Sequence, residues 1–164
     1  MHEERGLRIS GTDFVYLGEG AYAIIFADRE RGRIRKIYQA GHKLDHCRGV
    51  FTAEIGAYEI ASRIPEIQSL VPSYYGHCPG CVIIDAAGTD VTKEFYPDLA
   101  FEAELVECPF QKIGTAPSTE QAIIATLFRR HGIHHIKDAS VCLWDGKITK
   151  VIDFATREVE LWWE

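Results

Sequence analysis

The sequence predicts an α+β fold that opens with an antiparallel sheet. Three observations support this prediction. Turn residues separate three apolar strands before residue 40, apolar residues then recur at helical spacing over 50–63, and strand periods return after residue 140. The apolar fraction of 46% and the charged fraction of 26% are typical of globular chains, so we expect a packed core.

The first three strands follow from residue type and period. Residues 14–17 precede a Gly-Glu-Gly turn at 18–20, and residues 22–27 follow it. Gly32 completes the next turn, because glycine adopts the positive φ that hairpin turns need. Residues 33–38 alternate basic and apolar side chains with period two, which indicates a strand with one buried face.

The middle of the chain changes period. Residues 50–63 are predicted to form a helix, which Pro65 ends. Two further strands are expected at 69–75 and 81–85, joined by a turn that contains glycine and proline. A short helix is expected near 98–107.

The last third combines a helix with a hairpin. Ser118 is expected to cap the helix in a capping box with Gln121, and Gly132 is expected to end it. Residues 140–144 and 148–152 are predicted to form a hairpin around an Asp-Gly turn. No repeat or linker interrupts residues 1–164, so we expect one domain.

Charge and cysteine content narrow the function classes. The 18 basic and 24 acidic residues give a net charge of −6, which argues against nucleic acid as a partner. No run of 18 apolar residues is present, so we expect no membrane partner. An odd number of cysteines without framework spacing favours a reducing, intracellular and cytoplasmic location. They are Cys47, Cys78, Cys81, Cys108 and Cys142.

Four features carry chemistry. The first is the glycine-rich turn at 18–20. The second is Lys36, which needs an anion if its strand face is buried, because an unpaired buried ammonium is very costly. The third is Glu54 on the following helix, the carboxylate best placed to pair with this lysine. The fourth is Asp153 at the end of an apolar strand, where metal-binding carboxylates are often held.

The order of these parts resembles the protein-kinase-like superfamily, with its small-molecule kinases, over nearly the whole chain. The resemblance implies a reduced bilobal fold. Residues 1–87 would form an N-lobe with an antiparallel sheet, a C-helix and the hinge, and residues 88–164 a truncated helical C-lobe. The Tyr-Tyr-Gly segment at 74–76 and the Leu-Trp-Asp-Gly hairpin at 143–146 are similar to those of small fungal kinase-like proteins.

The resemblance also implies an ATP site. Gly18, Gly20 and Ala23 match the three glycine positions of the phosphate-covering loop. Lys36 matches the lysine that contacts the α- and β-phosphates, and Glu54 matches the glutamate that orients it.

Adenine and magnesium positions follow in the same way. Asp85 and Ala87 lie in the segment 83–88, which resembles the strand and hinge against which adenine stacks. Asp153 begins an Asp-Phe-Ala sequence that resembles the Mg²⁺-binding Asp-Phe-Gly motif. The implied cofactors are therefore ATP and Mg²⁺.

The catalytic loop departs from the family pattern of His-x-Asp followed by Asn. The best register places His134 on the family histidine, Ile136 on the catalytic aspartate and Val141 on the magnesium-binding asparagine. A register shifted by one residue uses His135 and Ser140 and also lacks an Asp–Asn pair. Isoleucine cannot accept a proton and valine cannot bind Mg²⁺, so impaired catalysis is expected.

The sequence also ends 11 residues after Asp153. The activation segment and helical substrate platform of a kinase are therefore expected to be missing. Leu161, Trp162 and Trp163 are expected to be exposed on the truncated C-lobe, as a surface for a protein partner or for self-association.

Each feature also has a structural interpretation. The glycine-rich turn suits an ordinary hairpin, Lys36 and Glu54 suit a structural ion pair, and Asp153 suits a strand-end cap. The Cys-x-x-Cys sequence at 78–81 suits half of a zinc site or a redox pair, but a turn with incidental cysteines is the favoured interpretation.

The leading functional hypothesis is a catalytically impaired, pseudokinase-like module that acts by binding a protein partner or a nucleotide. The alternative is an active ATP-dependent phosphotransferase that uses Asp138 or His135 as an unusual base, with His134 in the same loop. A third hypothesis is an interaction protein that kept the fold and lost the nucleotide pocket.

Overall fold

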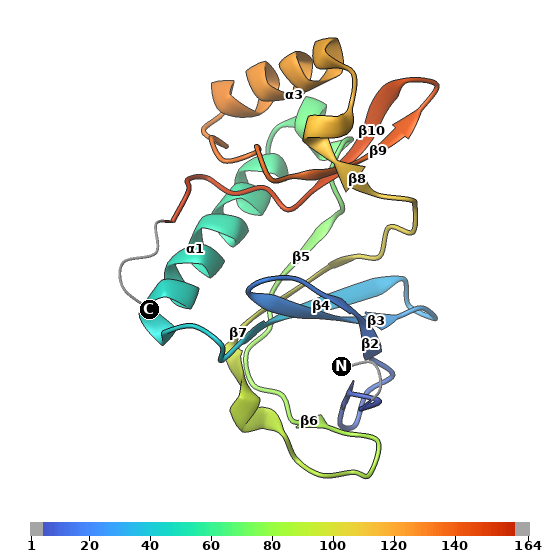
Figure 1. Cartoon of the computed structure of the whole chain (residues 1–164), viewed down its shortest axis with the longest axis vertical. Coiled ribbons are helices and arrows are strands. Elements are labelled where there is room, and N and C mark those ends of the chain that lie inside the picture. Colours follow the sequence, from blue (N-terminus) through green and yellow to red (C-terminus); the bar gives the residue numbers. More distant parts are fainter. Residues whose placement is uncertain (1–4, 160–164) are drawn as a thin grey trace. The chain divides into compact units, whose positions relative to one another are not determined.

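The computed structural model describes residues 5–159 and divides them into two compact units (Figure 1). The first unit contains residues 5–51 and 75–105, and the second contains residues 52–74 and 106–159. The fold class is α+β with an antiparallel sheet and few helices, as predicted. The tail that was expected to be exposed, Leu161, Trp162 and Trp163, lies outside the described residues.

The first unit is built on a curled seven-stranded sheet. The strands β1, β2, β3, β4 and β7 pair antiparallel to their neighbours, as do β1 and β6. In sheet order the strands are β5 (Tyr74–His77), β7 (Phe95–Glu104), β4 (Arg33–Gln39), β3 (Ala23–Asp28), β2 (Val15–Glu19), β1 (Arg8–Ile9) and β6 (Ile83–Ile84). The predicted strands at 14–17, 22–27 and 33–38 are confirmed as β2, β3 and β4.

One face of this sheet forms the core of the first unit. Ile24, Ile37 and Ala100 are paired across β3, β4 and β7, and all three are fully buried. Phe14, Phe26, Leu7, Ile9, Ile83, Val91 and Phe95 complete this cluster. Because side chains alternate along a strand, Lys36 lies on the opposite face from Ile37. On that opposite face Tyr38 contacts Phe51 of the long helix edge to face, at 5.7 Å between ring centroids.

The long helix α1 (Leu44–Ala61) begins six residues before the predicted start at residue 50. Its first part belongs to the first unit and its remainder to the second. No helix within residues 5–159 has the length and apolar character needed to cross a membrane.

The second unit combines helices with a three-stranded sheet. It contains α2 (Pro65–Gln68), α3 (Ser118–Arg130) and the strands β8 (Gln111–Lys112), β9 (Ser140–Trp144) and β10 (Lys147–Ile152). The predicted Asp-Gly turn between β9 and β10 is confirmed, with positive φ of 52° at Asp145 and 74° at Gly146. Short 3₁₀ turns occur at Thr92–Glu94 in the first unit and Ile113–Thr115 in the second.

The helix expected near 98–107 is wrong, because Phe95–Glu104 is strand β7. Leu99, Ala100 and Phe101 are buried in succession, since β7 lies inside the sheet between β5 and β4. A strand buried on both faces loses the period of two that identifies half-exposed strands. Consequently residues 88–105 lie in the first unit, whereas the sequence predicted them as the start of the second lobe.

The predicted capping box is also wrong. Helix α3 begins at Ser118, its N-cap is Pro117, and no side chain caps it. The Gln121 amide instead donates to the carbonyl of Ala116 at 2.7 Å and to that of Gly114 at 3.3 Å. The predicted helix end is confirmed, since Gly132 follows with a φ of 92°.

Candidate functional site

The glycine-rich turn and Lys36 lie on neighbouring strands of the first unit. Gly18 of β2 is paired with Ile25 of β3, and Ile25 is paired with Lys36 of β4. The backbone N–H of Gly20 donates to the carbonyl of Ala23 at 2.9 Å and closes the turn. The structure therefore brings four of the predicted nucleotide-binding residues to one part of the sheet.

The fold itself does not require glycine at either turn position. Neither Gly18 nor Gly20 adopts a positive φ, and a Cβ at either would meet no atom within 4 Å of the described residues. An ordinary hairpin that uses glycine for positive φ is therefore not what these residues form. Glycine also permits close approach of the backbone to a ligand, and the space beside both glycines is free of described atoms.

Asp85 and Ala87 lie at the far end of the sheet order. They follow β6, and three strands separate β6 from the strand of Lys36 in that order. The Asp85 carboxylate accepts the backbone N–H groups of Ala87 at 2.9 Å and Thr89 at 3.0 Å, so it serves a local turn. The chain passes from the first to the second unit after Phe51 and again after Leu105, and not at this predicted hinge.

The second unit gathers Glu54, Asp153 and their aromatic neighbours. Glu54 is only 5% exposed, and Tyr58 lies one turn further along α1. Burial, followed by the negative charges of Glu54 and Asp153, raises the pKa of Tyr58 well above its ordinary value. Both carboxylates therefore lie close enough to the Tyr58 hydroxyl to disfavour its ionisation.

Phe154 anchors the Asp-Phe-Ala sequence in this aromatic group. Its ring lies 4.7 Å from that of Tyr58 and 5.6 Å from that of Phe128, between centroids, and it is 1% exposed. Asp153 is exposed and has a φ of 63°, a left-handed conformation that is uncommon outside glycine and often marks functional sites.

The segment after Asp153 is held from two sides. The backbones of Ala155 and His135 exchange hydrogen bonds of 3.0 Å in both directions. Thr156 donates its N–H to the carbonyl of Ala53 in α1 at 3.0 Å, and its own carbonyl accepts from His134 at 3.2 Å. The structure thus places the predicted catalytic loop beside the predicted metal motif.

The side chains at the two positions matched to the family's catalytic aspartate and asparagine face the interior. Ile136 is 3% exposed and Val141 is fully buried. Asp138 is exposed, and its carboxylate lies 3.4 Å from Nε2 of His135. His134 is exposed and is held through its backbone.

The cysteines have two kinds of environment. Cys108 and Cys142 in the second unit are paired as a disulfide, which was not predicted and contrasts with the expected reducing location. Burial raises the pKa of Cys78 to about 12 and also raises that of Cys81, so both remain thiols near neutral pH. Within residues 5–159, no group of three or more His, Cys, Asp or Glu residues is arranged to hold a metal ion.

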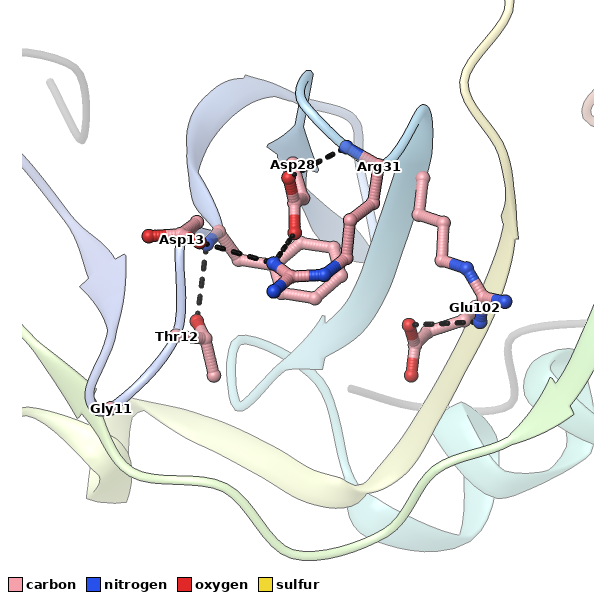
Figure 2. A pocket seen from close by; sticks show the side chains of 8 residues that line it. Gly11, Thr12, Asp13, Asp28, Arg31 and Glu102 are labelled. Carbon is pink, nitrogen blue, oxygen red and sulfur yellow. Dashed lines mark hydrogen bonds and ion pairs between the residues drawn. The ribbon is translucent and has the colours of Figure 1, made fainter.

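Sequence reasoning missed a cavity of about 680 Å³ in the first unit (Figure 2). Its polar lining combines arginines with carboxylates, and Arg31 and Asp28 point toward each other within it. The lining residues are Gly11, Thr12, Asp13, Phe14, Asp28, Arg31, Arg33 and Glu102. They come from the β1–β2 connection, the β3–β4 turn and β7, so no local motif signals the cavity.

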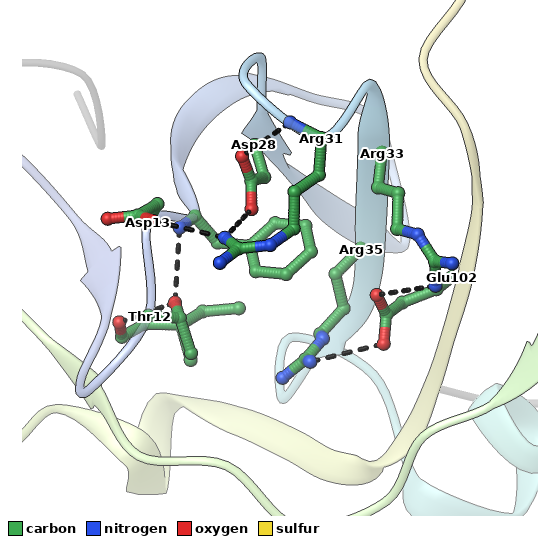
Figure 3. A network of polar contacts seen from close by, with 9 residues as sticks. Thr12, Asp13, Asp28, Arg31, Arg33, Arg35 and Glu102 are labelled. Carbon is green, nitrogen blue, oxygen red and sulfur yellow. Dashed lines mark hydrogen bonds and ion pairs between the residues drawn. The ribbon is translucent and has the colours of Figure 1, made fainter.

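Ion pairs connect the residues around this cavity (Figure 3). Nη1 of Arg31 lies 2.8 Å from Asp28 and 3.0 Å from Asp13. Glu102 lies between two arginines, 3.2 Å from Nη2 of Arg35 and 3.8 Å from Nη1 of Arg33. The hydrogen bond from Arg31 is the main cause of the lowered pKa of Asp28.

An Arg31→Gln variant is expected to lose stability in a pH-dependent way. The pKa of Asp28 is lower in the folded than in the unfolded protein, so its ionisation stabilises the fold above the unfolded pKa of about 3.9. This contribution disappears as the pH falls through the folded pKa. Urea unfolding should therefore separate variant from wild type most at pH 7 and least near pH 2, whereas a difference independent of pH would contradict the assignment.

Comparisons with known proteins do not identify a family. No family model, no curated protein and no solved structure matches this chain.

Proposed function

We propose that the chain is a reduced, protein-kinase-like binding module without phosphotransfer activity. The observation that carries the proposal is the packing of Phe154 on Tyr58, one helical turn after Glu54. In kinases the packing of the phenylalanine in Asp-Phe-Gly sets the active or inactive state, and the helix glutamate must be in place. Here one aromatic contact couples the candidate metal motif to the helix that carries the candidate glutamate.

The buried side chains of the catalytic loop support the absence of chemistry. A general base must lie within hydrogen-bond reach of the proton that it accepts, and Ile136 offers no acceptor. Mg²⁺ requires oxygen ligands, and Val141 offers none. Asp153 is a hard oxygen ligand, and a single carboxylate suits Mg²⁺ that arrives with nucleotide phosphates.

Nucleotide binding is supported by the first unit. Lys36 and Gly18 are both paired with Ile25, on either side of β3. Neither backbone conformation nor packing requires glycine at residues 18 and 20. A lysine beside an open backbone turn suits phosphate groups.

A protein partner is supported by exposed apolar groups on the second unit. Trp144 at the tip of the β9–β10 hairpin is 78% exposed, and Ile123 on α3 is 58% exposed. Large exposed apolar side chains of this kind are common where proteins bind one another.

A second candidate function is supported by Asp138. Its carboxylate is exposed and lies beside His135, so it has the chemistry of a general base at an unusual position. An active phosphotransferase would then act on a small molecule or a protein.

A transfer assay with γ-labelled ATP, with and without Mg²⁺, separates the two functions. The binding module is expected to transfer no label to itself or to added protein and sugar acceptors. Label transfer that requires Lys36 and is abolished by Asp138→Asn would contradict the proposal and establish the phosphotransferase.

A further inference from the structure

The cavity of the first unit contains arginines with unused hydrogen-bond donors. Arg31 engages its carboxylates through Nη1, while its Nε and Nη2 make no hydrogen bond within residues 5–159. Arg33 makes no hydrogen bond to any described residue, since Glu102 lies 3.8 Å away. Arg35 does not line the cavity; it lies on the same face of β4, and its buried Nε has no hydrogen-bond partner among the described residues.

The carboxylates of the same cavity are already engaged. Asp28 is 2% exposed and accepts the backbone N–H and Nη1 of Arg31. Asp13 accepts from the same Nη1, and Glu102 accepts from Arg35. The lining thus holds two arginines and three carboxylates, and each carboxylate already accepts a hydrogen bond from an arginine.

Two of the arginines are held in place by aromatic rings. The guanidinium of Arg33 lies 4.1 Å from the ring centroid of Tyr75, and that of Arg35 lies 4.8 Å from the ring centroid of Phe14. Such stacking fixes the plane of a guanidinium without using its N–H groups. Arg33 is 42% exposed, so its fixed donors are accessible.

We propose that this cavity binds a small oxyanion, a phosphoryl or carboxylate group, through Arg33 and Arg31. Planar guanidinium forks bind the two oxygens of such groups in a bidentate manner. Because the lining holds two arginines and three carboxylates, recognition of an anion depends on this hydrogen-bond geometry and not on a positive field. The site is separate from the proposed nucleotide function, since Arg33 and Arg35 lie on the face of β4 opposite to Lys36.

The test follows amide and arginine Nε–H signals in ¹H–¹⁵N NMR spectra of the whole chain at constant ionic strength. Inorganic phosphate is titrated in one series and citrate in another. We expect saturable shifts confined to the cavity, at the amides of Gly11, Thr12 and Arg31 and at the Nε–H groups of Arg31 and Arg33. Saturation by phosphate alone assigns a phosphoryl site, and saturation by citrate alone assigns a carboxylate site.

Arg33→Gln is expected to weaken the saturating anion at least tenfold, the effect of losing about 1.4 kcal/mol from charged hydrogen bonds. Arg63→Gln, an exposed change in the second unit, serves as the control and should leave the affinity unchanged. The spectra themselves show whether each variant is folded. Shifts that do not saturate, that spread over exposed arginines generally, or that persist in folded Arg33→Gln would overturn the proposal.

Discussion

Replacing Ile136 by aspartate is expected to lower the free energy of unfolding by about 3–5 kcal/mol, the cost of a buried charge without a partner. The substitution restores the residue type expected at the catalytic position, but Ile136 is 3% exposed. An aspartate there would lie among apolar side chains and could not reach a substrate hydroxyl. We therefore expect a less stable protein that still transfers no phosphate.

The pH dependence of this variant's stability shows whether the introduced carboxyl is buried. Burial raises the pKa of the introduced carboxyl above its unfolded value, so the loss of stability is smallest below about pH 4 and grows as the pH rises. Ile123→Asp is the matched control, because the same substitution at a 58% exposed position should cost less than about 1 kcal/mol. Urea unfolding of both variants at pH 4 and pH 7 measures the effect. Equal stability of the two variants, or label transfer by Ile136→Asp, would contradict the buried assignment.

Replacing Phe154 by alanine is expected to cost about 3–5 kcal/mol, the range for removing a fully buried phenylalanine. The ring contacts Tyr58 on α1 and Phe128 on α3, so its loss removes a contact shared by both helices. Because Asp153 precedes it with left-handed φ, the variant should also release the Asp-Phe-Ala segment from its fixed conformation.

Trp144→Ala is the matched control for this experiment. It removes a larger aromatic ring from the same unit at a position that is 78% exposed, so stability should change by about 0.5 kcal/mol or less. Thermal unfolding of both variants measures the two losses of stability. A cost below about 1 kcal/mol for Phe154→Ala would show that the aromatic group does not hold this part of the second unit together.

The strands and the hairpin that were predicted correctly are bounded by clear turn residues. Strand β4 begins with the alternation of Arg33, Ile34 and Arg35, and the Asp-Gly turn of the last hairpin has a strong conformational preference. Strand β7 was missed because its middle is buried on both faces. The turn at 85–87 was predicted to be a hinge. A short apolar strand has the same sequence pattern whether it lies at the end of a sheet or leads from one domain to another.

The candidate site was only partly accessible to sequence reasoning. Lys36 was placed on the sheet face that the period indicated, and Glu54 and Asp153 lie beside the same tyrosine. The cavity could not be predicted, because Asp13, Arg31 and Glu102 come from separate segments and each resembles an ordinary surface charge. The two arginines on one face of β4 were the available signal, but a charged period of two usually indicates a solvated face.

A thermal-shift titration with ATP and Mg²⁺ tests the central claim most directly. Nucleotide at about one hundred times its dissociation constant should add about 2.7 kcal/mol of stability to the wild type. Lys36→Ala should lose this shift, while Lys93→Ala, an exposed lysine of the same unit, and Arg33→Gln on the opposite face of β4 should keep it. No shift in the wild type, or a shift lost in Arg33→Gln and kept in Lys36→Ala, would contradict a kinase-like nucleotide site.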